Sequence, residues 1–170
     1  MVTINLAYTA PINPPSASPA LTLAQVWEGL VHKVRRADLF VPVITSCQVL
    51  KEETNNSNRQ EVDVITRRVT FRASTALTAS ETVVEVCHLY PPCRVDFKQE
   101  DGTLIGNYVS EGPDGELYMT YMFEWRIPGV MAGSEEAKAL EDKYRKVARM
   151  AVEGSINTIR AIARGEITIH

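Results

Sequence analysis

The sequence is poor in the features that mark several large classes of protein. It has only three cysteines among 170 residues, Cys47, Cys87 and Cys93, and no two of them form a CxxC pair. An odd number of scattered thiols is typical of a reducing compartment rather than of a disulfide framework. No run approaches the roughly 18 apolar residues of a membrane span. The first residues show no charged segment followed by an apolar core, so we expect a cytoplasmic protein.

Positive charge and metal-binding spacing are also scarce. The formal net charge is −3 at pH 7, which argues against nucleic acid or an anionic membrane surface as a partner. The one short basic run, from Lys33 to Arg36, is interpreted as a solvated helix end. The three histidines, His32, His88 and His170, are scattered without metal-ligand spacing, so no metal and no cofactor are predicted.

The motifs of several common enzyme families are absent as well. There is no Gly-x-Gly-x-x-Gly, no Walker loop and no Gly-x-Ser-x-Gly elbow, which argues against dinucleotide, nucleotide and α/β-hydrolase chemistry. The length and a hydrophobic content of 45% fit one domain, residues 1–170, with a sizeable core.

The sequence does contain a series of β-segments ahead of one long helix. Val2–Thr9 alternates apolar and polar residues, as a strand does, and a proline-rich loop follows it. The capping box Thr22–Gln25 predicts a short helix. The further predicted strands are Val43–Leu50, Val62–Phe71, Thr82–Leu89, Arg94–Lys98, Leu104–Ser110 and Glu116–Arg126. A polar turn over Thr54–Asn58 is expected between the first two of these.

The last predicted element is a single amphipathic helix over Ser134–Arg164. Ser134 is placed to cap it, and a helix of this length is roughly 45 Å long, which is enough to cross a whole sheet. Short connections between the strands favour an antiparallel order. We therefore predict an α+β fold in which a curved antiparallel sheet of about seven strands grips the C-terminal helix, with a short helical segment after the first strand. One helix cannot fill the concave side of such a sheet, so a ligand pocket is expected there.

Several segments carry a resemblance to a known family across nearly the whole chain. They are the Pro-Ile-Asn-Pro-Pro run from Pro11, the Leu-Thr-Leu-Ala-Gln-Val-Trp-Glu-Gly-Leu helix from Leu21, Phe-Val-Pro-Val-Ile-Thr-Ser-Cys from Phe40, Thr-Arg-Arg-Val-Thr-Phe from Thr66, Leu-Tyr-Pro-Pro from Leu89 and Ser-Glu-Gly-Pro-Asp-Gly-Glu-Leu-Tyr from Ser110. In these segments the chain resembles the AtaL-like family, within the helix-grip superfamily of START proteins, polyketide cyclases and birch-pollen allergens.

The resemblance implies a hydrophobic cavity between the sheet and the C-terminal helix. Some members of the family sit in fungal secondary-metabolite clusters, and the wider superfamily includes aromatase/cyclases, lipid carriers and hormone receptors. A fold that serves so many functions does not by itself decide one.

Strand alternation nominates two opposed sets of catalytic residues. If Val69 and Phe71 face inward, Arg67 does so too, and Glu85 faces inward if Cys87 does. Arg67 and Glu85 then form a pair that orients a polar substrate or supplies a general acid or base; the alternative is an exposed cross-strand ion pair.

The opposite alternation would place His88 in the pocket instead, as a proton shuttle. Glu85 and His88 cannot both face the cavity in a regular strand, and the sequence leaves the choice open.

The last strand is expected to supply an aromatic wall suited to a flat or polyene ligand. Its Tyr121 is the best candidate for a phenol that hydrogen-bonds or protonates a bound carbonyl, and Tyr144 on the helix could act in the same way. One of Asn107 and Tyr108 is expected to point inward. The predicted ligand-binding residues are Trp27, Phe71, Cys87, Asn107, Tyr108, Met119, Phe123, Trp125, Tyr144 and Ala151.

Two functions fit these residues. One is a cofactor-independent enzyme that cyclises, eliminates or isomerises a hydrophobic polyketide- or peptide-derived intermediate by shape and acid/base chemistry. The other is a carrier of small hydrophobic molecules without catalysis. Both take a small hydrophobic or aromatic ligand, and the protein could be a monomer or a homodimer.

Overall fold

A computed structural model describes residues 1–57, 60–72 and 81–169. Its element order is strand, two helices, six strands and a helix. The elements are β1 (Val2–Pro11), α1 (Leu23–Arg35), α2 (Ala37–Phe40), β2 (Ile44–Ser57), β3 (Gln60–Phe71), β4 (Thr82–Tyr90), β5 (Arg94–Gln99), β6 (Leu104–Glu111), β7 (Leu117–Ile127) and α3 (Glu135–Ala163).

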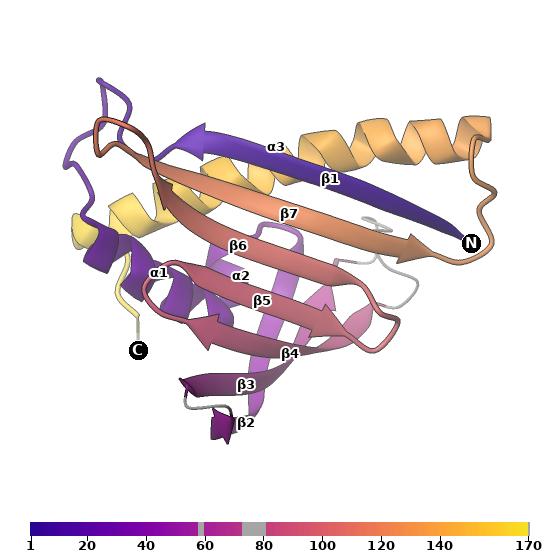
Figure 1. The fold of residues 1–170 in the computed structure, drawn as a ribbon, viewed down its shortest axis with the longest axis horizontal. Coiled ribbons are helices and arrows are strands. Elements are labelled where there is room, and N and C mark those ends of the chain that lie inside the picture. Colours follow the sequence, from indigo (N-terminus) through magenta and orange to yellow (C-terminus); the bar gives the residue numbers. More distant parts are fainter. Residues whose placement is uncertain (58–59, 73–80, 170) are drawn as a thin grey trace.

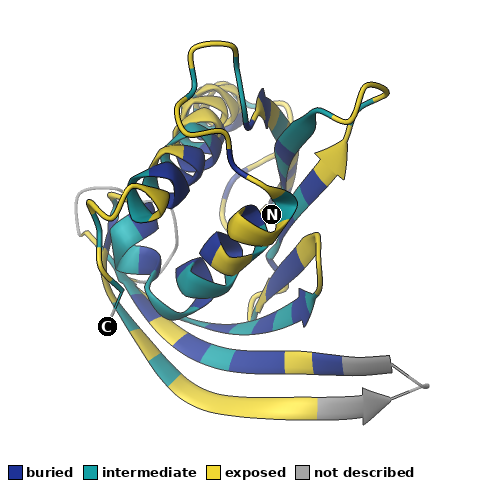
Figure 2. Ribbon diagram, turned by 90° about the vertical axis from the view of Figure 1, so that its left-hand side faces the viewer, coloured by how far each residue is buried: buried dark blue, intermediate teal, exposed yellow. Residues whose placement is uncertain are grey.

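The seven strands form one antiparallel sheet in the order β1-β7-β6-β5-β4-β3-β2 (Figure 1). The first strand therefore pairs with the last, from Val2 opposite Ile127 to Pro11 opposite Tyr118. The sheet bends round α1 and α3, as Figure 2 shows, and its inward side chains form the main hydrophobic core with both helices. The predicted α+β helix-grip architecture is confirmed.

Local sequence signals explain where the helices begin. Thr22 accepts a hydrogen bond from the Gln25 amide, and the Gln25 side chain binds back to the Thr22 amide, so the predicted capping box forms. Ser134 accepts from the Ala137 amide at the start of α3. The acidic residues Glu135 and Glu136 follow in the first turn, where the helix dipole favours them.

The β2–β3 hairpin is longer than the sequence predicted. β2 continues to Ser57, and Thr54 pairs with Asp63 across the ladder, so most of the segment expected to be a turn is strand. Polar residues can form this part of the strand because β2 lies at the edge of the sheet and its residues from Lys51 to Thr54 are exposed. Asn58, at the end of the expected turn, lies outside the described residues.

Side chains on α3 bind both the sheet and the proline-rich loop. The Tyr8 hydroxyl on β1 donates to Glu153 Oε1 at 2.8 Å. Closer to the C-terminal end of α3, the Arg160 guanidinium donates to the carbonyls of Ile12 and Pro19. None of the described helices is both long enough and apolar enough to span a bilayer.

Candidate functional site

A pocket lies between the concave face of the sheet, the end of α1, the α2–β2 connection and the middle of α3. Its volume is about 90 Å³, which is less than the roughly 150 Å³ of an apolar cavity known to admit benzene. In this conformation it therefore takes a small group, and a larger guest requires its walls to move. The lining residues are Lys33, Val41, Val43, Ile44, Arg67, Phe71, Glu85, Phe97, Gln99, Ile105, Tyr121, Phe123, Trp125, Val147 and Ala151.

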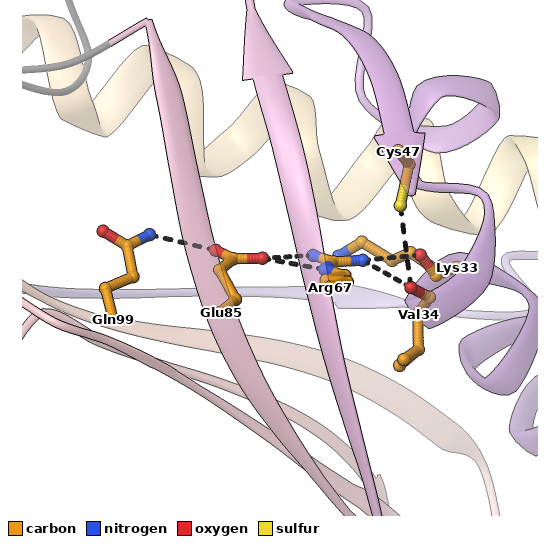
Figure 3. A network of polar contacts seen from close by, with 6 residues as sticks. All are labelled: Lys33, Val34, Cys47, Arg67, Glu85 and Gln99. Atoms are coloured by element: carbon orange, nitrogen blue, oxygen red, sulfur yellow. Dashed lines mark hydrogen bonds and ion pairs between the residues drawn. The ribbon is translucent and has the colours of Figure 1, made fainter. Parts of the chain in front are cut away.

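One end of the pocket is a buried ion pair with its own hydrogen-bond network (Figure 3). Arg67 on β3 lies directly opposite Glu85 on β4, and both side chains are only 4% exposed. Arg67 Nε and Nη2 approach Glu85 Oε2 at 2.8 and 2.6 Å. The other carboxylate oxygen accepts from Gln99 Nε2 at 2.9 Å. Both carboxylate oxygens of Glu85 therefore have a protein partner, as a buried carboxylate requires.

Arg67 also joins the sheet to the end of α1. Its Nη1 donates to the backbone carbonyls of Lys33 and Val34, each at 2.9 Å. These carbonyls belong to the last turn of the helix, where intrahelical donors run out. The Cys47 thiol adds a weaker contact to Val34 O at 3.8 Å. The guanidinium thus caps α1 and fixes the position of Lys33.

Lys33 is the second cation at this end of the pocket. It is 6% exposed, and its Nζ lies 4.0 Å from the centroid of the Tyr121 ring and 5.6 Å from that of Phe97. The guanidinium carbon of Arg67 lies over the same Phe97 ring at 4.8 Å. Burial first, and then the charge of Arg67, lower the pKa of Lys33 well below its ordinary value.

The opposite end is an aromatic and aliphatic wall. The rings of Phe123 and Trp125 stack at 4.4 Å, and Trp125 stacks in turn on Tyr144 of α3 at 4.3 Å. Tyr121 meets Phe123 edge-on at 6.3 Å. Ala151 and Val147 of α3 close this side. The wall suits a flat apolar ligand whose polar end points towards Lys33.

Further polar atoms are buried at Tyr121 and next to it. The Tyr121 hydroxyl, the Ser155 hydroxyl and the side-chain amide of Asn107 have no partner with hydrogen-bond geometry among the described residues. Burial raises the pKa of Tyr121, and the Ser155 hydroxyl only partly offsets this. The phenol therefore keeps its proton and has hydrogen-bonding capacity to offer.

The structure brings part of the predicted site together. Of the predicted catalytic residues, Arg67, Glu85 and Tyr121 line the pocket, and so do four of the predicted ligand-binding residues: Phe71, Phe123, Trp125 and Ala151. On β4, Glu85, Cys87 and Leu89 are buried, whereas His88 is only partly buried. The alternation that the sequence left open thus places Glu85 inward and His88 on the outer side.

Other predicted residues lie outside the pocket lining. Cys87, Asn107 and Met119 face inward, but all three are completely buried. They do not line the pocket because the core fills their part of the sheet. Burial raises the pKa of Cys87 to about 12, which keeps its thiol protonated. The remaining residues outside the lining are Trp27, Tyr108 and Tyr144.

The interpretation of Lys33 as part of a solvated helix end was wrong. Its spacing contained the signal, because Val26, Leu30 and Lys33 recur at helical period and Val26 and Leu30 are core residues. Phe97 and Gln99 were also missed. They pair with Cys87 and Glu85 across β4 and β5, so the alternation of β4, once known, would have located them. Among the described residues, no three His, Cys, Asp or Glu side chains form a potential metal site; His170 lies outside them.

A curved antiparallel sheet closed by a long C-terminal helix is the helix-grip class of fold, which solved START and cyclase proteins share. The Zhui aromatase/cyclase from Streptomyces sp. R1128 matches with a TM-score of 0.56 and 16% identity, over 98% of this chain and 97% of that one. A START superfamily protein from Mycobacterium smegmatis matches with a TM-score of 0.60 and 6% identity, over 94% and 98% of the two chains. At such identities the likeness establishes the fold alone.

The family is narrower than this class. The family model described as acetylaranotin biosynthesis cluster protein L matches residues 6–165. The protein of that name from Aspergillus terreus (strain NIH 2624 / FGSC A1156) is 31% identical over 158 residues, which are 93% of this chain and 88% of the relative. The chain belongs to this AtaL family.

Proposed function

We propose that the protein is a cofactor-independent enzyme of secondary-metabolite biosynthesis. It binds a hydrophobic polyketide- or peptide-derived intermediate in the pocket and promotes its cyclisation, elimination or isomerisation. The name of the Aspergillus terreus relative refers to a biosynthesis cluster, and solved structures of the same fold include aromatase/cyclases. These relatives support the biosynthetic role, whereas the type of reaction is argued from the pocket.

The ionisable cluster inside an apolar pocket carries the proposal. Burying Arg67 and Glu85 costs several kcal/mol of desolvation per ion before their contacts offset it, and the amine of Lys33 is buried beside them. A carrier of apolar compounds does not need a buried ionisable group without a partner, whereas an enzyme needs an ionisable group within reach of the reacting atom. The apolar wall would hold the carbon skeleton, and the cluster would face its carbonyl or enol group.

A carrier without catalysis is the alternative, and one observation favours it. Both oxygens of Glu85 and most of the donors of Arg67 already bind other protein atoms. Such a pair would hold the walls of the pocket in place without taking or giving a proton.

An aromatic ketone distinguishes the two functions. We expect 2-tetralone to bind, quenching the fluorescence of Trp125, and we expect the protein to accelerate deuterium exchange of its α-protons in D₂O above the buffer rate. Binding without faster exchange would make the protein a carrier. If 2-tetralone leaves both the fluorescence and the thermal midpoint unchanged, the pocket is not a ligand site. Tyr121→Phe should retain binding and slow the exchange if the phenol supplies a proton.

A further inference from the structure

Within the described part of the chain, the buried amine of Lys33 has no acidic partner of its own. Among the described residues, the contacts of Nζ are the faces of the Tyr121 and Phe97 rings. The nearby carboxylate, Glu85, is already bound by Arg67 at one oxygen and by Gln99 at the other. An amine that is more than nine-tenths buried, lines a pocket and lacks a hydrogen-bond acceptor has its lone pair or its protons available for a ligand.

Charge balance indicates the state of this amine. Arg67 keeps its proton at any pH a protein survives, so its charge and that of Glu85 cancel, and a protonated Lys33 would leave the cluster with an unpaired charge. The Tyr121 ring face favours the cation by about 2 kcal/mol, whereas burial of an unpaired charge costs several kcal/mol. The other titratable groups facing it are Cys87 and Tyr121, whose raised pKa values keep them neutral. The lowered pKa of Lys33 agrees with this balance.

We propose that Lys33 is a nucleophile whose amine condenses with a ketone or aldehyde carbonyl of the bound substrate to form a Schiff base. The inference rests on the proposed function and deepens it, since it names the substrate class as carbonyl compounds with an apolar or aromatic body. Desolvation in an apolar pocket beside a second cation is one of the established ways to activate a lysine amine.

The step balances without any co-reactant. The Nζ lone pair forms a bond to the carbonyl carbon, and the C=O π pair moves to oxygen, which takes up a proton transferred from nitrogen. The nitrogen lone pair then forms the C=N bond as the hydroxyl group departs, and this hydroxyl leaves as one water with the second proton of the amine. Protonation of the imine then makes the adjacent C–H acidic, so carbon–carbon bond formation or elimination can follow there. Hydrolysis of the imine regenerates the amine, with no change in oxidation state.

Arg67 and Glu85 act on Lys33 as positioning residues. Arg67 donates to the carbonyl of Lys33 itself, and Glu85 fixes the guanidinium from the other side. The pair therefore holds the backbone from which the amine projects, and its cation stands close enough to oppose protonation of that amine. This gives the fully satisfied ion pair a role in catalysis that does not require it to touch the substrate.

The probe for this proposal is 2,4-pentanedione, which condenses with a free amine to an enaminone that absorbs in the near ultraviolet. We expect the wild-type protein to gain the mass of one diketone less one water on the peptide that holds Lys33. Each unit by which the pKa falls raises the neutral fraction about tenfold, so at pH 7 Lys33 should react about tenfold faster than exposed Lys51, or more. Its rate should level off with rising pH well below 10.5.

Two variants make the test decisive. Lys33→Met should lose the fast adduct, whereas Lys51→Met, which alters a lysine whose side chain is 62% exposed, should keep it. A pocket ligand such as 2-naphthol should protect Lys33 and leave Lys51 unprotected. If Lys33 reacts no faster than Lys51, or its rate follows an ordinary lysine titration, the proposal is overturned. Binding and exchange of 2-tetralone are measured separately, so this failure would leave the proposed function standing.

Discussion

At the scale of single residues, the buried Arg67–Glu85 pair is the costliest feature to disturb. We expect Glu85→Gln to lower the free energy of unfolding by about 3–5 kcal/mol, because it leaves the Arg67 cation buried without its counter-ion. The control is Glu52→Gln, since Glu52 pairs with Arg35 on the exposed surface, where such pairs contribute about 0–1 kcal/mol. Urea unfolding of both variants gives the comparison; similar losses in the two would contradict a buried ion pair.

Replacing Lys33 should change the free energy of unfolding in the opposite direction. Its pKa is lower in the folded protein than in the unfolded chain, so between the folded value and 10.5 the unfolded chain binds more protons and stability rises with pH. Lys33→Met removes this penalty, and we expect it to raise the free energy of unfolding at pH 7 by about 1–4 kcal/mol.

The pH dependence provides the check on this variant. The advantage of Lys33→Met should be constant below the folded pKa and should shrink as the pH rises towards 10.5, the value in the unfolded chain. Chemical unfolding at a series of pH values measures it. An advantage that does not change with pH would mean that packing, and not charge, is responsible.

The sequence narrowed the candidate pocket residues to a few alternatives, but it could not decide which side chains face the pocket. Strand alternation nominated Arg67 and Glu85 as one of two alternatives, because they share the alternation of the apolar residues on their own strands. The choice against His88 could not be made, since Val84 and Val86 on the outer side of β4 are also apolar and only half buried. Lys33 was missed because a lysine close to two arginines is typical of a solvated helix end. Only the structure shows that a pocket lies beside it.

At the scale of elements, two helical glycines differ in what surrounds them. A Cβ on Gly29 of α1 would lie 2.4 Å from Ile159 Cγ1 of α3, whereas one on Gly154 of α3 would meet only the Phe40 carbonyl, at 3.7 Å. Gly29→Ala should therefore destabilise the protein by about 1–3 kcal/mol through overpacking. Gly154→Ala should stabilise it by up to about 1 kcal/mol through helix propensity.

Thermal unfolding of the two glycine variants tests how closely α1 packs on α3. The same substitution is made in each helix, so stabilisation of both variants would show that helix propensity decides and that the close approach at Gly29 is not required. Because Lys33 lies one turn beyond Gly29 on α1, Gly29→Ala should also slow its reaction with 2,4-pentanedione.

Element boundaries followed the local signals in the sequence. The caps at Thr22 and Ser134 fixed the starts of α1 and α3, because an N-cap is decided within one turn of chain. The end of β2 was misplaced, since asparagines and a serine favour turns locally but here continue an edge strand with β3. Pairing across a sheet is a contact between distant segments, and composition within a short window does not contain it.

At the scale of the whole molecule, the small size of the pocket makes it easy to block. Ala151 on α3 lines the pocket, and Ala151→Leu should place its added carbons there. We expect binding of 2-naphthol to weaken at least tenfold while the free energy of unfolding stays unchanged or rises by about 0.5–2 kcal/mol, as in cavity filling. Ala139→Leu, at an exposed position of the same helix, is the control and should bind normally. Equal affinity in the two variants would place the ligand elsewhere.

The pairing of β1 with β7 has a consequence for folding during synthesis. β1 is synthesised more than 100 residues ahead of its hydrogen-bonding neighbour, since Val2 pairs with Ile127. The entropy of closing so large a loop is lost before the contacts between β1 and β7 can stabilise the fold. Folds dominated by such non-local pairings form in milliseconds to seconds rather than microseconds. Until then β1 presents an unpaired edge to every nascent chain nearby, so a chaperone that shelters this segment should raise the yield of native protein.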